Sequence, residues 1–121
     1  MRCRPILVLD DDPHVRALLA TILEKSGFKV VSASDARSAL AQCEVEIPQL
    51  MIVDLMLPVE DGEAFLDKFR LRHHAENVPV IVLSASARRD SVARRVNASA
   101  TLAKPFTAQD LRALVHKHTT P

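Results

Sequence analysis

Three apolar stretches of this sequence each end in polar side chains that can bind a metal ion or take part in phosphoryl chemistry. They are Ile6–Leu9 before Asp10, Asp11 and Asp12, Leu50–Val53 before Asp54, and Val80–Leu83 before Ser84. Each stretch has the length and composition of a buried strand. Because a carboxylate is costly to remove from water, an aspartate in this position indicates the open end of a strand. We therefore expect one site assembled from three strand ends.

Carboxylates gathered at one place need positive charge beside them. Asp10, Asp11 and Asp54 would repel one another and raise each other's pKa values, and Mg²⁺, a hard cation that prefers oxygen ligands, would relieve this. Lys104, at the end of a later strand, supplies a second positive charge. A metal, an amine, the Ser84 hydroxyl and a carboxylate nucleophile are the parts needed to move a phosphoryl group onto aspartate. Taken alone, the run of aspartates is equally compatible with a turn and a helix cap, and the lysine with an ordinary surface residue.

The remaining sequence alternates predicted strands and helices. The predicted strands are Pro5–Leu9, Phe28–Ser32, Leu50–Val53, Val80–Leu83 and Ala100–Ala103. Capping residues mark the helix ends. They are Asp12 with Pro13 and then Gly27 for the first helix, Ser34 or Asp35 for the second, Gly62 before the third, Ser86 for the fourth, and Thr107 with Asp110 for the last.

Five strands alternating with five helices predict an α/β fold with a parallel sheet covered on both faces. Right-handed crossovers favour a doubly wound, three-layer arrangement with strand order 2-1-3-4-5. This order places a crevice between the first and third strands at their carboxyl ends, where Asp10, Asp11 and Asp54 would meet. We expect residues 1–121 to form a single domain.

Composition limits the function classes. Of the 121 residues, 48% are hydrophobic, which excludes an intrinsically disordered chain. The first residues lack the apolar core of a signal peptide, and no apolar stretch is long enough to span a bilayer. Cys3 and Cys43 do not have the spacing of metal ligands, so we expect reduced thiols in a cytoplasmic protein that does not contact membranes, with Cys43 buried as a small apolar residue.

Charge is distributed unevenly along the chain. Residues 84–121 contain seven Lys and Arg against two Asp and Glu, whereas the first 83 residues contain nine against thirteen. The basic part could face an acidic partner, but a solvated helix surface is the favoured interpretation. Arg88, Arg89, Arg94 and Arg95 have no aromatic residues among them and no nucleic-acid-binding motif, so we expect no direct contact with nucleic acid.

Four motifs, in this order, resemble the receiver domain of two-component response regulators. They are Leu7–Asp12, Met51–Pro58 with Asp61-Gly62, Val80–Ala85 and Lys104–Phe106, and the resemblance covers essentially the whole chain. It implies that Asp54 accepts a phosphoryl group from a histidine kinase or a histidine phosphotransfer protein. It also implies that Asp10, Asp11, Asp54 and the backbone carbonyl of Met56 hold Mg²⁺, with Mn²⁺ as a substitute.

The resemblance further implies how the signal leaves the site. Lys104 would pair with the phosphoryl oxygens, Ser84 would move to donate a hydrogen bond to them, and the bond between Lys104 and Pro105 would be cis. The fourth helix, fifth strand and fifth helix would form the face read by a downstream partner or a fused output domain, or by a second copy in a phosphorylation-linked homodimer. Such a protein is a signalling module that assists only its own phosphorylation and slow autodephosphorylation.

The sequence departs from the family pattern in the readout region. Many receivers have an aromatic switch residue at the position of Thr101, and this chain contains no Tyr or Trp. The predicted switch residues are Ser84 and, at the position of that aromatic residue, Thr101. The interval from Ser84 to Lys104 is shorter than usual, which predicts a short or irregular fourth helix. Asn97 is expected at a positive-φ position, which asparagine tolerates.

Two other functions compete with the phosphorylated receiver. One is an interaction module on the same fold that no longer uses phosphate, which Thr101 and the short segment favour. The other is a phosphatase or other phosphotransfer enzyme with an aspartate nucleophile. Such an enzyme usually has a second carboxylate two residues after the nucleophile, where this chain has Met56, so turnover of an external substrate is not expected.

Overall fold

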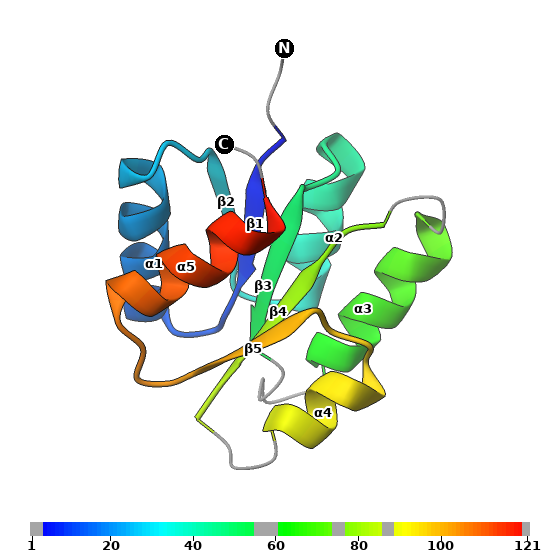
Figure 1. The fold of residues 1–121 in the computed structure, drawn as a ribbon. Coiled ribbons are helices and arrows are strands. Elements are labelled where there is room, and N and C mark those ends of the chain that lie inside the picture. The colour runs from blue at the N-terminus through cyan, green and yellow to red at the C-terminus, as the bar shows by residue number, and fades with distance from the viewer. Residues whose placement is uncertain (1–3, 55–60, 74–76, 86–88, 120–121) are drawn as a thin grey trace.

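The strands form one five-stranded parallel sheet in the order β2-β1-β3-β4-β5 (Figure 1). The computed structural model describes residues 4–54, 61–73, 77–85 and 89–119. The strands are β1 Ile6–Leu9, β2 Val30–Ala33, β3 Leu50–Asp54, β4 Val80–Ser84 and β5 Ala100–Ala103. The predicted fold class and strand order are confirmed.

The three central strands are buried along their whole length. Every residue of β1, β3 and β4 is buried, as expected for parallel strands covered on both faces. The register aligns Leu9 with Val53, and Asp54 with Leu83. It therefore brings Asp10, Asp54 and Ser84 to the same edge of the sheet.

Helices cover both faces of the sheet (Figure 1). They are α1 Pro13–Lys25, α2 Ala36–Val45, α3 Asp61–Arg72, α4 Arg89–Arg95 and α5 Ala108–His118. The buried apolar residues form two clusters, one shared by α2, α3 and α4 and the other by α1 and α5. The molecule thus has two cores separated by the sheet.

Most predicted helix ends are confirmed. Asp12 accepts a hydrogen bond from the backbone of His14 at 2.9 Å, with Pro13 in the first helical position. Asp35, rather than Ser34, caps α2. Gly27 follows α1 with a φ of 94°, a backbone conformation that glycine adopts without strain. Thr107 caps α5 through the backbone N–H of Asp110 at 3.0 Å. Ser86 lies outside the described residues. The prediction that the third helix follows Gly62 is wrong, because α3 includes Asp61 and Gly62.

The second strand differs from its prediction. It begins at Val30 instead of Phe28, because the backbone N–H of Phe28 donates to Leu23 O at 3.1 Å and closes the end of α1. The Phe28 ring is nevertheless buried in the core beside α1 and α5.

The segment after β4 has the predicted irregularity. The helix α4 contains only seven residues, and Asn97 follows it with a φ of 57°. The bond between Lys104 and Pro105 is cis. Cys43 is buried, as predicted. Among the described residues, no helix has the length and apolar character needed to cross a membrane.

Candidate functional site

Three carboxylates meet at the carboxyl edge of the sheet. Oxygen atoms of Asp10, Asp11 and Asp54 all lie within 4.8 Å of one another. Asp10 has no exposed surface and Asp54 is 5% exposed, whereas Asp11 faces solvent. Asp54 ends β3, and Asp10 and Asp11 follow β1, so neighbouring parallel strands place these carboxylates together. The predicted convergence of the three aspartates is therefore confirmed.

Lys104 lies between the two buried carboxylates. Its Nζ is 2.9 Å from Asp54 Oδ2 and 2.9 Å from Asp10 Oδ2. Burial by itself lowers the pKa of Lys104, but the hydrogen bonds and negative charges of Asp54 and Asp10 together outweigh it, and the pKa is raised. Lys104 therefore carries a full positive charge at neutral pH.

Asp10 is held by its neighbours but remains electrostatically costly. Oδ1 accepts a hydrogen bond from the backbone N–H of Asp12 at 2.9 Å. Oδ2 is paired with the Lys104 ammonium at 2.9 Å, and no second donor among the described residues reaches this atom. Burial raises the pKa of Asp10 even though the Asp12 N–H and Lys104 both favour its charged form. Further positive charge beside Oδ2 would therefore be favourable.

Arg16 is a site residue that the motifs did not reveal. Its Nη1 donates to the backbone carbonyl of Asp10 at 2.8 Å from the second turn of α1. The backbone N–H of Arg16 donates to Asp12 O at 3.1 Å. Arg16 lies in α1, so its side chain holds the turn that carries Asp10 and Asp11 against the start of this helix. The available signal was a cation shortly after the predicted helix start at Pro13.

Ser84 and Lys104 lie at the ends of adjacent strands. Ser84 is 2% exposed at the end of β4 and is aligned with Ala103 of β5. The backbone N–H of Lys104 donates to Ser84 O at 3.1 Å, so the two loops are joined directly. Thr101 lies on β5, and its Oγ1 donates to Asp90 Oδ1 of α4 at 3.3 Å. Met56, the predicted carbonyl ligand, lies outside the described residues.

The site suits a hard divalent cation. Asp10, Asp11 and Asp54 offer only oxygen atoms, the ligands that Mg²⁺ prefers. One of these atoms, Asp10 Oδ2, is buried, and Lys104 is its one partner among the described residues. A cation held by these carboxylates would satisfy that atom and reduce the repulsion between the carboxylates.

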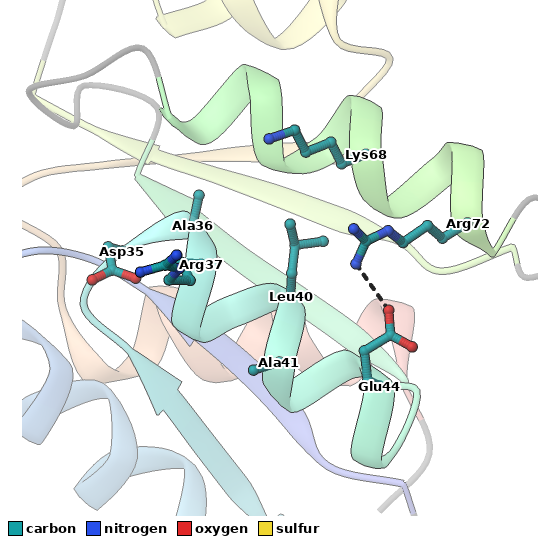
Figure 2. Close-up of a pocket in the computed structure, with 8 residues that line it drawn as sticks. All are labelled: Asp35, Ala36, Arg37, Leu40, Ala41, Glu44, Lys68 and Arg72. Atoms are coloured by element: carbon teal, nitrogen blue, oxygen red, sulfur yellow. Dashed lines mark hydrogen bonds and ion pairs between the residues drawn. The ribbon is translucent and has the colours of Figure 1, made fainter.

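A separate cavity of about 550 Å³ lies between α2 and α3 (Figure 2). Figure 2 shows Lys68 and Arg72 of α3 reaching over Leu40 of α2, with Arg72 paired to Glu44 at 3.0 Å. The three aspartates of the cluster do not line this cavity. Its charged groups come in both signs and do not converge on one point. The cavity therefore lacks the clustered carboxylates that lie at the edge of the sheet.

Comparison with known proteins agrees with the geometry. Residues 6–116 match the model of the response regulator receiver domain family. The chain is 36% identical over 115 residues to an uncharacterised 14.6 kDa protein of Leptolyngbya boryana, covering 93% of this chain and 88% of that one. It is 31% identical over 114 residues to the phosphate regulon transcriptional regulatory protein PhoB of Escherichia coli, covering 93% of this chain but only 50% of PhoB.

A solved structure is also similar to this chain over nearly its whole length. The chemotaxis protein CheY4 of Vibrio cholerae superposes with a TM-score of 0.88 at 25% identity, and the match covers 98% of this chain and 100% of CheY4. The similarity therefore extends over the whole domain and includes the strand ends that carry the acidic cluster.

Proposed function

The chain belongs to the response regulator receiver domain family of two-component systems, and on this premise we propose that Asp54 is the residue that accepts a phosphoryl group. The donor would be a phosphohistidine of a histidine kinase or of a phosphotransfer protein. An oxygen of Asp54 forms the bond to phosphorus while the phosphorus–nitrogen bond breaks. The histidine keeps that electron pair and takes up a proton.

The residues around Asp54 provide the charge that this transfer needs. Asp10, Asp11, Asp54 and the backbone carbonyl of Met56 would hold Mg²⁺, or Mn²⁺ in its place. When bound, the cation neutralises charge on the transferred group. Lys104, which already contacts Asp54, pairs with a phosphoryl oxygen. Arg16 holds the backbone of Asp10 in position.

Phosphorylation would change the contacts of Lys104 and Ser84. The phosphoryl group adds about −1.5 to −2 charge and three acceptor oxygens. The ammonium of Lys104 and the hydroxyl of Ser84 both turn to these oxygens, and their joined backbones carry the change into β4 and β5. We propose that Ser84 and Thr101 act as the switch, and that α4, β5 and α5 present the result to a partner.

The observation that best supports this proposal is the position of Lys104 Nζ, 2.9 Å from a carboxylate oxygen of both Asp54 and Asp10. The test is incubation with acetyl phosphate and Mg²⁺, followed by intact-protein mass spectrometry. We expect one added phosphoryl group, which is lost with Asp54→Asn and when EDTA replaces Mg²⁺. Asp35→Asn is the matched control, because that carboxylate caps α2 outside the cluster. Labelling that survives Asp54→Asn would contradict the proposal.

The alternative function is an interaction module that does not use phosphate. Thr101 at the position of an aromatic switch residue favours it, and an unmodified Asp54 in the acetyl phosphate experiment would support it. Turnover of an external phosphate ester is not proposed, because Met56 occupies the position of a second carboxylate. We expect only slow hydrolysis of the protein's own aspartyl phosphate.

The setting of this module is also a proposal. PhoB is twice as long as the matched region, so an output domain fused to a receiver is one arrangement, and a separate downstream protein is the other. A phosphorylation-linked homodimer through α4, β5 and α5 is compatible with either. We place the protein in the cytoplasm, where a histidine kinase would phosphorylate it.

A further inference from the structure

The short helix α4 is packed on the same core as α3. Ala93 lies within α4 and Val96 directly follows it. Both belong to the apolar cluster that contains Phe65 and Phe69 of α3. The residues of α5 belong to the other cluster, across the sheet. Figure 1 shows α4 and α3 side by side on one face. The apolar contacts of α4 are therefore made with α3 and the sheet.

Arg70 of α3 binds the carboxyl end of this helix. Its Nη1 donates to Val96 O, and its Nη2 donates to Asn97 O at 3.3 Å. The last carbonyl groups of a helix have no partner within the helix. Val96 and Asn97 directly follow Arg95, the last residue of α4, and their carbonyls lie in the turn that closes the helix. Arg70 is thus a capping group supplied by a neighbouring helix.

A second arginine, which is the last residue of α4, joins the same end of α4 to the first turn of α3. Arg95 Nε donates to Glu63 Oε1 at 2.9 Å, and Arg95 Nη2 also contacts this oxygen. Both side chains are more than a third exposed, so this pair contributes less than the partly buried Arg70 contact. Together the two contacts join the first turn and the last turns of α3 to α4.

The strand β5 also packs directly against α4. A described polar contact between them is the hydrogen bond from Thr101 to Asp90, which at 3.3 Å is long for a hydroxyl donor. Thr101 also has no ring that could pack differently in two states of the protein. Among the described polar contacts at α4 and its carboxyl end, those of Arg70 and Arg95 are therefore stronger than the one made by Thr101.

We propose that α3 and α4 move as one body, with Arg70 as the main positioning residue and Arg95 as the second, so that phosphorylation is read on α3 as well as on α4. This inference rests on the proposed function. The helix α4 follows Ser84 along the chain, and a change at Ser84 that shifts α4 would shift α3 through these arginines. The readout surface then includes the exposed side of α3.

The first test measures the anchoring in the unmodified protein by amide hydrogen exchange. Arg70→Met removes the donors but keeps an apolar stem, and we expect the amides of residues 96–98 to exchange about tenfold faster. Arg72→Met is the matched control, because Arg72 lies on the same helix and pairs with Glu44 of α2 instead. Equal exchange in the two variants would overturn the anchoring role.

The exposed pair gives a variant with little risk to the fold. Arg95→Gln and Glu63→Gln should each increase exchange in α4 severalfold, and the double variant should add nothing to the larger single effect. Strict additivity would show that the two side chains do not act as a pair.

The second test follows the signal with acetyl phosphate and Mg²⁺. In the unsubstituted protein we expect NMR shift changes in residues 67–72 of α3 as well as in α4, and in Arg70→Met we expect those in α3 to be lost while Asp54 is still modified. A silent α3 in the modified protein, or an unchanged α3 response in Arg70→Met, would overturn the inference. If mass spectrometry finds no modification of Asp54, the proposed function fails instead, and the exchange comparison alone decides whether α3 anchors α4.

Discussion

The acidic site and α4 lie on either side of residues 85–88 in the sequence, yet different kinds of interaction hold them in place. Asp10, Asp54 and Ser84 are attached to strands in which every residue is buried. The helix α4 packs on β4 and β5 through few buried residues, Ala93 and Val96 directly after it, and arginines at the protein surface add polar contacts. The site is therefore built on the most stable part of the molecule and the readout helix on a less stable part.

This difference suits a receiver. If Asp54 accepts a phosphoryl group as proposed, the carboxylates and Lys104 would have to keep their spacing, and packed strands provide that rigidity. In the proposed readout, α4 would change position, and polar contacts with a few arginines can be exchanged more easily than a packed core. The following experiments test the contrast, from the largest expected effect to the smallest.

The strand core should be far less tolerant of truncation than α4. Ile81→Ala in β4 removes a fully buried side chain and should lower the free energy of unfolding by about 3–4 kcal/mol. Val96→Ala, at the end of α4, should cost about 1 kcal/mol because the site is 9% exposed and can relax. Urea denaturation of both variants measures this. Similar losses in the two variants would remove the contrast.

The buried thiol of Cys43 makes the stability of the core around α2 depend on pH. Burial raises the pKa of its thiol from 9.0 to about 11, helped by the charge of Glu44. The folded state therefore favours the neutral thiol, and stability that is fully present below pH 9 should fall as the pH rises towards 11. The loss approaches about 3 kcal/mol, since each pKa unit corresponds to about 1.4 kcal/mol.

The measurement is urea denaturation at pH 8 and at pH 10.5, with Cys43→Ala as the reference for all other titrating groups. A difference between the two proteins that does not change with pH would contradict the buried thiol. Thiol labelling of Cys43 at pH 8 should follow global unfolding, and should be slower than amide exchange in α4.

Lys104 should matter for stability as well as for phosphorylation. Lys104→Met leaves Asp10 and Asp54 buried without their cation. It should destabilise the metal-free protein by about 2 kcal/mol, below the roughly 3–5 kcal/mol for a fully buried pair because Lys104 is 23% exposed. Urea denaturation in EDTA measures this. Lys117→Met, at an exposed position of α5, is the control. An unchanged stability would mean that the carboxylates are already neutral.

Mg²⁺ should stabilise the site in a pH-dependent way. At ten times its dissociation constant, a bound ion stabilises the fold by about 1.4 kcal/mol. Because burial raises the pKa of Asp10, the metal-free fold loses stability as the pH rises from 3.8 through that raised pKa. Mg²⁺ binds the ionised form, so its effect should grow over the same range and vanish in acid. Thermal unfolding with and without Mg²⁺ measures this, and Asp10→Asn should remove most of the effect.

The smallest effect is expected at Thr101. Thr101→Val keeps the shape of the side chain and removes only an exposed 3.3 Å hydrogen bond to Asp90, so stability should change by less than about 0.5 kcal/mol. Phosphorylation of Asp54 by acetyl phosphate should be unchanged. A large loss of stability would show that β5, and not α3, holds α4.

The amino-acid order by itself determined the sheet, most helix ends and the main site residues. Apolar runs that end in Asp10, Asp54 and Ser84 specify strand ends, and parallel strands must bring their ends to one edge. Caps such as Asp12 and Thr107 act within a few residues, so they can be recognised locally. The short α4 and the positive φ of Asn97 were predicted from the resemblance to the receiver family, in which the interval between Ser84 and Lys104 is usually longer.

Only the tertiary structure decided which long side chains meet across elements. Arg70 at the end of α4 and Arg95 beside Glu63 each depend on how α3 and α4 pack. An arginine on a helix can reach several neighbours, and its sequence position does not choose among them. Its partner depends on where the sheet places the helices, because an interaction across 26 residues of chain, as between Arg70 and Val96, has no local pattern.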